Sequence, residues 1–136
     1  MFLVDTNIWL ERILDQDKSH QVQSFLQQIS SNKLFITDFT YHSIGVIITT
    51  LGQGDAFDRF TRDICMDGAV SLIRLKPEAS KQLIEVIDQF KLDFDDAYQY
   101  LAAELNDLTI VSFDKDFDKT KLGRKTPSQI LKQLNP

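Results

Sequence analysis

The sequence predicts an α/β fold of three layers, α/β/α, in which a mainly parallel central sheet has helices on both faces. Short apolar runs alternate along the chain with longer segments of helical periodicity, which is typical of parallel strands joined by helices. The length of 136 residues matches one domain. Hydrophobic residues make up 43% of the chain and charged residues 26%, as in ordinary globular domains. We therefore expect residues 1–136 to form a single domain.

The first half of the chain predicts three strands with helices between them. Phe2–Val4 is a short apolar run, and the capping residue types Asp5, Thr6 and Asn7 predict the start of a helix directly after it. Apolar residues at helical spacing predict a second helix over residues 22–29. In chain order, we then expect a strand at 34–36, a helix at 41–51, a short helix at 57–64 and a strand at 70–73. The buried stripe of the helix at 41–51 is predicted to consist of Tyr41, Ile44, Ile47, Ile48 and Leu51.

The second half predicts the elements that complete the three layers. Pro77 is typical of the first turn of a helix, and apolar residues continue at helical spacing to Phe90. A turn leads into a further helix over residues 97–105. We expect a fourth strand at 108–111 and a last helix at 128–134.

The composition excludes several kinds of site. Cys65 is the only cysteine, so neither an internal disulfide nor a cysteine-based zinc site can form. The chain has only two histidines, which excludes a histidine-rich metal site, and its net charge of −5 argues against a generally basic nucleic-acid coat. Because the sequence contains no recognisable signal segment and no long apolar window, we expect a cytoplasmic protein that does not enter a membrane.

Three aspartates are predicted to meet at one edge of the sheet. Asp5 follows the first strand, Asp114 follows the fourth, and Asp96 lies at the start of a helix. In an open parallel sheet, ligands bind beyond the carboxyl ends of the strands. Carboxylates about 4 Å apart repel by about 1 kcal/mol in water and by more in a shielded cleft, so a hard divalent cation usually neutralises them. These residues are therefore candidate ligands for Mg²⁺ or Mn²⁺, ions that activate water for phosphodiester hydrolysis.

A structural role is the alternative for the same aspartates. Asp is among the residue types preferred at helix N-termini, and both Asp5 and Asp114 come directly after a predicted strand. The acidic run at residues 93–96 can equally be a solvated turn that caps the next helix. Spacing alone leaves both interpretations open.

Three segments together carry a resemblance to a known family. They are LVDTNIW (Leu3–Trp9), FDDAYQYLAA (Phe94–Ala103) and IVSFDKDF (Ile110–Phe117). In this order they resemble the signature segments of the PIN-domain family, and the order of elements matches from Phe2 to about Leu134. The resemblance implies a PIN-like fold and an Mg²⁺- or Mn²⁺-dependent ribonuclease that cleaves RNA. Small members of this length resemble VapC-type toxins, which implies an antitoxin partner and a homodimer.

The resemblance also implies a role for individual residues. By position, Asp5, Asp96 and Asp114 correspond to catalytic, metal-binding acids of the family. The implied supporting residues are Asn7, which orients Asp5, Ser112, which holds Asp114, and Asp116, which supports the metal through water.

The sequence departs from the family pattern at one acidic position. The family has a glutamate on the helix after the second strand, and Ser43 stands there instead. Asp38 is the nearest acid, and we expect it to cap that helix. Three aspartates still suffice for one Mg²⁺, which needs only one or two carboxylates besides water and phosphate. The alternative is a degenerate PIN domain that binds RNA or protein without catalysis.

A basic stretch near the carboxyl terminus has two interpretations. Residues 119–132 contain no acid, and the stretch either contacts RNA phosphates or is a solvated face. Its basic residues are Lys119, Lys121, Arg124, Lys125 and Lys132.

Four apolar residues also have two possible interpretations. Trp9, Phe57, Phe60 and Ile64 either mark a surface for a protein partner or belong to the core. A phospho-receiver domain also gathers acids at strand ends, but that fold needs an aspartate after the third strand, and none is present.

Overall fold

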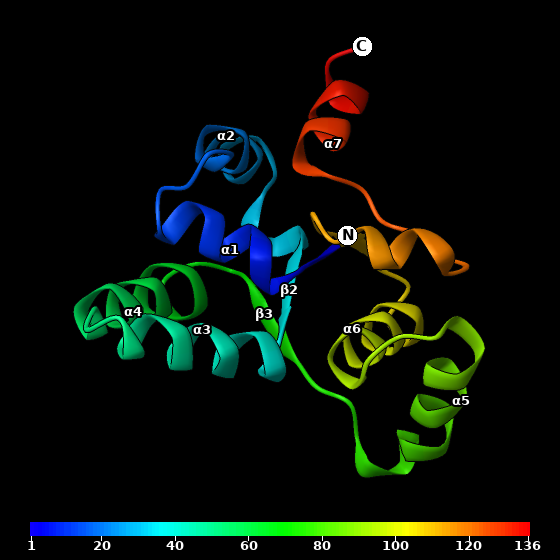
Figure 1. Cartoon of the computed structure of the whole chain (residues 1–136). Coiled ribbons are helices and arrows are strands. Elements are labelled where there is room, and N and C mark those ends of the chain that lie inside the picture. Colours follow the sequence, from blue (N-terminus) through cyan, green and yellow to red (C-terminus); the bar gives the residue numbers. More distant parts are fainter.

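Four parallel strands form the centre of the computed structural model, which describes all residues from 1 to 136 (Figure 1). Their order across the sheet is β3-β2-β1-β4. In the register of the sheet, Phe2 lies opposite Leu34 on one side and Thr109 on the other. The strands are β1 (Phe2–Val4), β2 (Leu34–Thr37), β3 (Ser71–Ile73) and β4 (Thr109–Val111).

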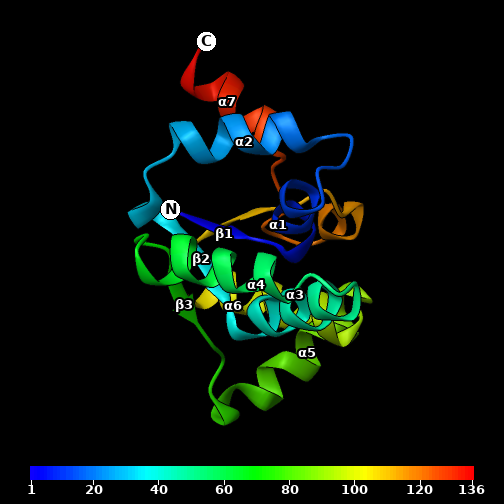
Figure 2. The ribbon, with the colours of Figure 1, turned by 90° about the vertical axis from the view of Figure 1, so that its left-hand side faces the viewer.

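Helices cover both faces of the sheet (Figure 1, Figure 2). One apolar core unites α1, α2, α3, α4 and α7 with one face, and a second core unites α5 and α6 with the other. The predicted three-layer α/β/α fold with a parallel sheet is therefore confirmed. The helices are α1 (Thr6–Ile13), α2 (Ser19–Gln28), α3 (Asp38–Thr50), α4 (Gly54–Phe60), α5 (Ser80–Phe90), α6 (Phe94–Leu105) and α7 (Pro127–Leu134).

The strands contribute to both cores because successive side chains point to opposite faces of a sheet. In β1, Val4 packs into the core beneath α1, whereas Leu3 packs into the core beneath α6. In β4, Val111 and Ile110 divide in the same way. Strands buried on both faces are almost continuously apolar, and for this reason β1, β2 and β4 appear in the sequence as short apolar runs, whereas the edge strand β3 is largely exposed.

The order of the strands reverses between β1 and β4. From β1 to β3 the chain advances in one direction, with α1 to α4 on one face of the sheet. The segment containing α5 and α6 then returns along the other face, so that β4 pairs with the free side of β1. Such a reversal leaves a crevice beyond the carboxyl ends of the two strands concerned. The residues that follow Val4 and Val111 therefore border this crevice.

The structure corrects two predictions about α3. Ile44 and Ile48 are buried, but Ile47 and Leu51 are exposed, because they lie on a neighbouring stripe of the helix that is turned away from the sheet. The helix is capped by Thr37, not Asp38: the Thr37 hydroxyl accepts from the Thr40 amide at 3.0 Å.

The carboxylate of Asp38 has another contact: it accepts a hydrogen bond from the Tyr98 hydroxyl at 2.8 Å. This contact joins the start of α3 to α6. Among the helices described above, none is both long enough and apolar enough to cross a membrane.

Candidate metal site

A cleft of about 390 Å³ opens where the strand order reverses, and six carboxylates line it. Asp5 enters it from the end of β1, and Asp114 and Asp116 enter it from the turn after β4. Asp93, Asp95 and Asp96 come from the start of α6. The other lining residues are Thr6, Asn7, Leu10, Phe39, Ser43, Ile47 and Gln99.

Asp5 is buried, and its carboxylate accepts four hydrogen bonds. Oδ1 accepts from the Thr6 amide at 2.8 Å and from Gln99 Nε2 at 2.9 Å. Oδ2 accepts from Ser112 Oγ at 2.7 Å and from Asn7 Nδ2 at 3.4 Å. Burial raises the pKa of Asp5, while the hydrogen bonds from Gln99, Ser112 and the Thr6 amide act in the opposite direction. We call Asp5 with these four donors the Asp5 network.

The Asp5 network joins the ends of β1 and β4. Asn7 Nδ2 donates to Ser112 Oγ at 3.1 Å, and Asn7 Oδ1 accepts from the Phe113 amide at 3.2 Å. Ser112 Oγ in turn accepts from the Asp114 amide at 2.9 Å. Ser112 thus contacts the backbone of Asp114 and directs its own proton to Asp5. Asp5 is also the N-cap of α1, so both interpretations of this residue, cap and site residue, describe the same contacts.

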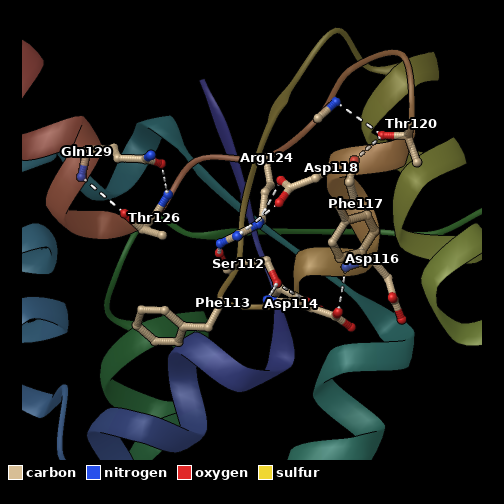
Figure 3. Close-up of polar contacts among 12 residues, drawn as sticks. Ser112, Phe113, Asp114, Asp116, Phe117, Asp118, Thr120, Arg124, Thr126 and Gln129 are labelled. Carbon is tan, nitrogen blue, oxygen red and sulfur yellow. Dashed lines mark hydrogen bonds and ion pairs between the residues drawn. The ribbon is translucent and has the colours of Figure 1, made fainter.

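Asp96, Asp114 and Asp116 form a second group, which we call the carboxylate cluster. One carboxylate oxygen from each lies within 4.8 Å of the others. Asp114 Oδ1 also accepts from the Asp116 amide at 2.9 Å, which keeps the two residues on one tight turn (Figure 3). Burial, followed by the charges of Asp114, Asp93, Asp5 and Asp116, raises the pKa of Asp96 to about 7.

The carboxylate cluster fits a hard divalent cation. The ligand atoms that it offers are all carboxylate oxygens, the type that Mg²⁺ and Mn²⁺ prefer. The raised pKa of Asp96 reflects burial first and then neighbouring negative charge, which no basic side chain lining the cleft compensates. A cation of charge +2 would relieve this repulsion. Ser43 lines the cleft from α3, and its hydroxyl brings no charge to this wall.

Among the basic residues of the stretch 119–132, Lys119, Arg124 and Lys125 have partners within the chain. Lys119 Nζ donates to the Lys91 carbonyl at 2.9 Å, and Lys125 Nζ donates to the Gln133 side chain at 3.0 Å. Lys121 is exposed.

Arg124 contacts the turn that carries Asp114. Its guanidinium pairs with Asp118 at 3.0 Å and donates to the Ser112 carbonyl at 3.2 Å (Figure 3). Because its side chain is only 13% exposed, Arg124 stabilises this turn from within the structure.

Gln99 is the site residue that sequence reasoning missed. It is 1% exposed and lies on α6, three residues after Asp96. The available signal was an amide within the otherwise apolar run from Ala97 to Ala103, where a buried polar side chain needs hydrogen-bond partners.

A separate groove of about 400 Å³ lies between α1, α2 and α4. Trp9 and Phe60 are buried there, with their rings 5.4 Å apart in edge-to-face geometry, and so belong to the core. Phe57 and Ile64 are half-buried, and Ile64 lines the groove. The remaining lining residues are Arg12, Ile13, Leu26, Ala56, Arg59 and Asp63.

Comparison with known proteins identifies the family. The PIN domain family model matches residues 2–122, so the chain belongs to the PIN domain family. A search of curated protein sequences finds no match. Several solved structures share the fold at low sequence identity.

The fold is similar to that of three bacterial proteins. A toxin–antitoxin complex from Klebsiella pneumoniae matches with a TM-score of 0.73 and 16% identity over 93% of this chain and 98% of that one. VapC20 of Mycobacterium tuberculosis is described as a toxin that cleaves the sarcin–ricin loop. It matches with a TM-score of 0.75 and 12% identity over 90% of this chain and 96% of that one. FitAcB from Neisseria gonorrhoeae matches with a TM-score of 0.72 and 17% identity over 94% of this chain and 99% of that one.

Proposed function

We propose that this protein is a metal-dependent endoribonuclease that hydrolyses RNA phosphodiester bonds, and that it is the toxin of a cytoplasmic toxin–antitoxin pair. The observation that carries the proposal is the carboxylate cluster, which lies beside Asp5 at the strand reversal of a PIN domain. Asp5, Asp96 and Asp114 are the proposed ligands of Mg²⁺ or Mn²⁺, and Asp116 supports the ion directly or through water.

The residues of the chain have distinct tasks in this proposal. When bound, the divalent ion stabilises charge on the phosphate and lowers the pKa of water. Asp96, whose pKa is raised to about 7, would hold the ion as the deprotonated carboxylate. Asn7 and Ser112 keep the Asp5 carboxylate against the end of β4. The hydrogen bond from the Asp114 amide to Ser112 Oγ holds the turn that follows β4.

Partners are proposed from the surface. The groove between α1, α2 and α4 combines apolar side chains with Arg12 and Arg59, a surface that suits an antitoxin segment carrying apolar and acidic residues. Val46 on α3 and Leu51 directly after it are exposed and are candidates for a homodimer contact. Lys119, Lys121, Arg124 and Lys125 remain the proposed basic residues for RNA binding, and of these Lys119 and Lys121 are exposed.

Cleavage of a mixed-sequence RNA in Mn²⁺ tests the proposal. Asp96→Asn and Asp114→Asn should each reduce cleavage by roughly 100-fold or more, as expected when charge stabilisation of the transition state is removed. Asp88→Asn, on the exposed face of α5, is the matched control and should cleave like the native chain. Cleavage that persists in both site variants or in excess EDTA would contradict the proposal.

The second candidate function is a module that binds RNA without turnover, and Ser43 is the observation that favours it. In that case the native chain binds RNA but does not cleave it, while Ser43→Glu creates metal-dependent cleavage. Activity of the native chain would reject this alternative.

A further inference from the structure

The side chain of Gln99 lies between the carboxyl ends of β1 and β2, on the inner side of the cleft. It is 1% exposed, and both of its polar atoms have partners from other elements. Nε2 donates to Asp5 Oδ1 at 2.9 Å and to Thr40 Oγ1 at 2.8 Å. Oε1 accepts from Thr37 Oγ1 at 2.6 Å. A buried amide without such partners would destabilise the fold, so each contact contributes to keeping Gln99 in place.

The partners determine the orientation of the amide. An ionised carboxylate can only accept hydrogen bonds, so the NH₂ end of Gln99 must face Asp5. The carbonyl end then faces Thr37, whose hydroxyl donates to it. Thr37 is itself fixed, because its hydroxyl also accepts from the Thr40 amide at the start of α3. A flipped amide would direct its carbonyl oxygen at the carboxylate, which repels it.

Gln99 is the one donor of the Asp5 network that comes from α6. Thr6, Asn7 and Ser112 all belong to segments that directly follow β1 or β4. Gln99 and Asp96 are three residues apart on the same helix and therefore lie on neighbouring positions of one helical face. The hydrogen bond from Gln99 is thus the direct link between Asp5 and the helix that carries Asp96.

We propose that Gln99 is a positioning residue of the metal site, which sets the place of the Asp5 carboxylate relative to the carboxylate cluster. The inference rests on the proposed metal-dependent function and deepens it. Without the amide, Asp5 Oδ1 retains only the Thr6 amide as a donor, and α6 loses its direct hydrogen bond to Asp5. Hydrogen bonds that orient metal ligands typically change metal affinity by roughly 10- to 100-fold.

Two measurements on the full chain test this inference. In NMR spectra, the side-chain amide signal of Gln99 should exchange slowly with solvent and shift as Mg²⁺ is added, whereas that of Gln89, exposed on α5, should do neither. By calorimetry, Gln99→Met should weaken Mn²⁺ binding by roughly 10-fold or more, because methionine matches the shape but has no donor. Tyr100→Phe is the matched control, since it removes a buried hydroxyl from the next position of α6 that contacts Glu104 and not the cleft.

The outcomes separate this inference from the proposed function. If backbone amides at Asp96 and Asp114 shift with Mg²⁺ while Gln99 does not, and Gln99→Met binds Mn²⁺ like the native chain, the positioning role is overturned and the metal site stands. An equal loss of affinity in Gln99→Met and Tyr100→Phe would also overturn it, because the effect would then be general to α6. If no signal of the cleft responds to Mg²⁺, the proposed function itself fails, and the inference fails with it.

Discussion

The Asp5 network and the carboxylate cluster lie in the same cleft, yet their carboxylates are stabilised in opposite ways. The carboxylate of Asp5 accepts four hydrogen bonds from uncharged donors and is 7% exposed. Those of Asp96, Asp114 and Asp116 lie close together, and mutual repulsion contributes to a pKa of about 7 for Asp96. Uncharged donors of the chain stabilise the Asp5 carboxylate, whereas the mutual repulsion within the carboxylate cluster is the part that a cation would relieve.

This difference indicates how the site is organised before an ion binds. The four uncharged donors of the Asp5 network hold this carboxylate in place, and the contact from Asn7, at 3.4 Å, is the longest of them. That arrangement fixes one side of the cleft through the folded chain alone. The carboxylate cluster is electrostatically unfavourable, because neighbouring carboxylates repel one another. This repulsion is relieved when a carboxylate is protonated or when a cation neutralises the charge.

The largest expected effect comes from removing the carboxylate of Asp5. Asp5→Ala should lower the free energy of unfolding of the metal-free protein by about 3 kcal/mol, because buried donors lose their acceptor. Asp116→Ala, at an exposed position of the same cleft, should change it by no more than about 0.5 kcal/mol. Urea unfolding in EDTA measures both. Equal effects of the two variants would show that the two groups do not differ as described.

A smaller effect is expected from the ion itself. Mn²⁺ at 100 times its Kd should raise the free energy of unfolding by about 2.7 kcal/mol, which corresponds to a rise in Tm of roughly 10 °C. Asp96→Asn should abolish this rise, because it removes a carboxylate from the cluster. Thermal unfolding with and without Mn²⁺ provides the test, and a full rise in the variant would place the ion elsewhere.

The pH dependence of the stability of the metal-free protein should reflect the raised pKa of Asp96. The pKa of Asp96 is raised to about 7 in the folded chain but is close to 3.8 when unperturbed, so between these values the folded state binds more protons. Lowering the pH from 8 to about 5 should therefore stabilise the native chain relative to Asp96→Asn. Unfolding curves of both proteins in EDTA measure the difference. If it stays constant with pH, neither burial nor the neighbouring charges raise the pKa of Asp96.

The smallest effect is expected at Ser43, whose substitution sharpens the contrast between the two groups. Ser43→Glu adds a carboxylate to the cleft from α3 and should reduce the stability of the metal-free protein by about 0.5 kcal/mol while strengthening Mn²⁺ binding. Ser43→Gln has nearly the same shape without the charge. Calorimetry should find tighter binding for the glutamate variant only, and equal affinities would contradict a role for charge at this position.

Much of the fold could be predicted because its pattern is local. Buried parallel strands appear as short apolar runs, and this placed β1, β2 and β4 within a residue or two of their observed bounds. The stripe on α3 was less certain, since Ile47 and Ile48 are equally apolar and only packing against the sheet determines which is buried. For the same reason Trp9 and Phe60 could not be assigned to the core beforehand.

By itself, the sequence determined the order of the elements, their apolar faces and the position of Asp5, Asp96 and Asp114 at element ends, since periodicity and capping are properties of neighbouring residues. Only the tertiary structure decided which carboxylates group together and which are satisfied. Ser112 and Gln99 contact Asp5 across 107 and 94 residues of chain, and contacts over such separations exist only after the sheet has formed. The strand order, which reverses between β1 and β4, therefore creates the cleft in which these side chains meet.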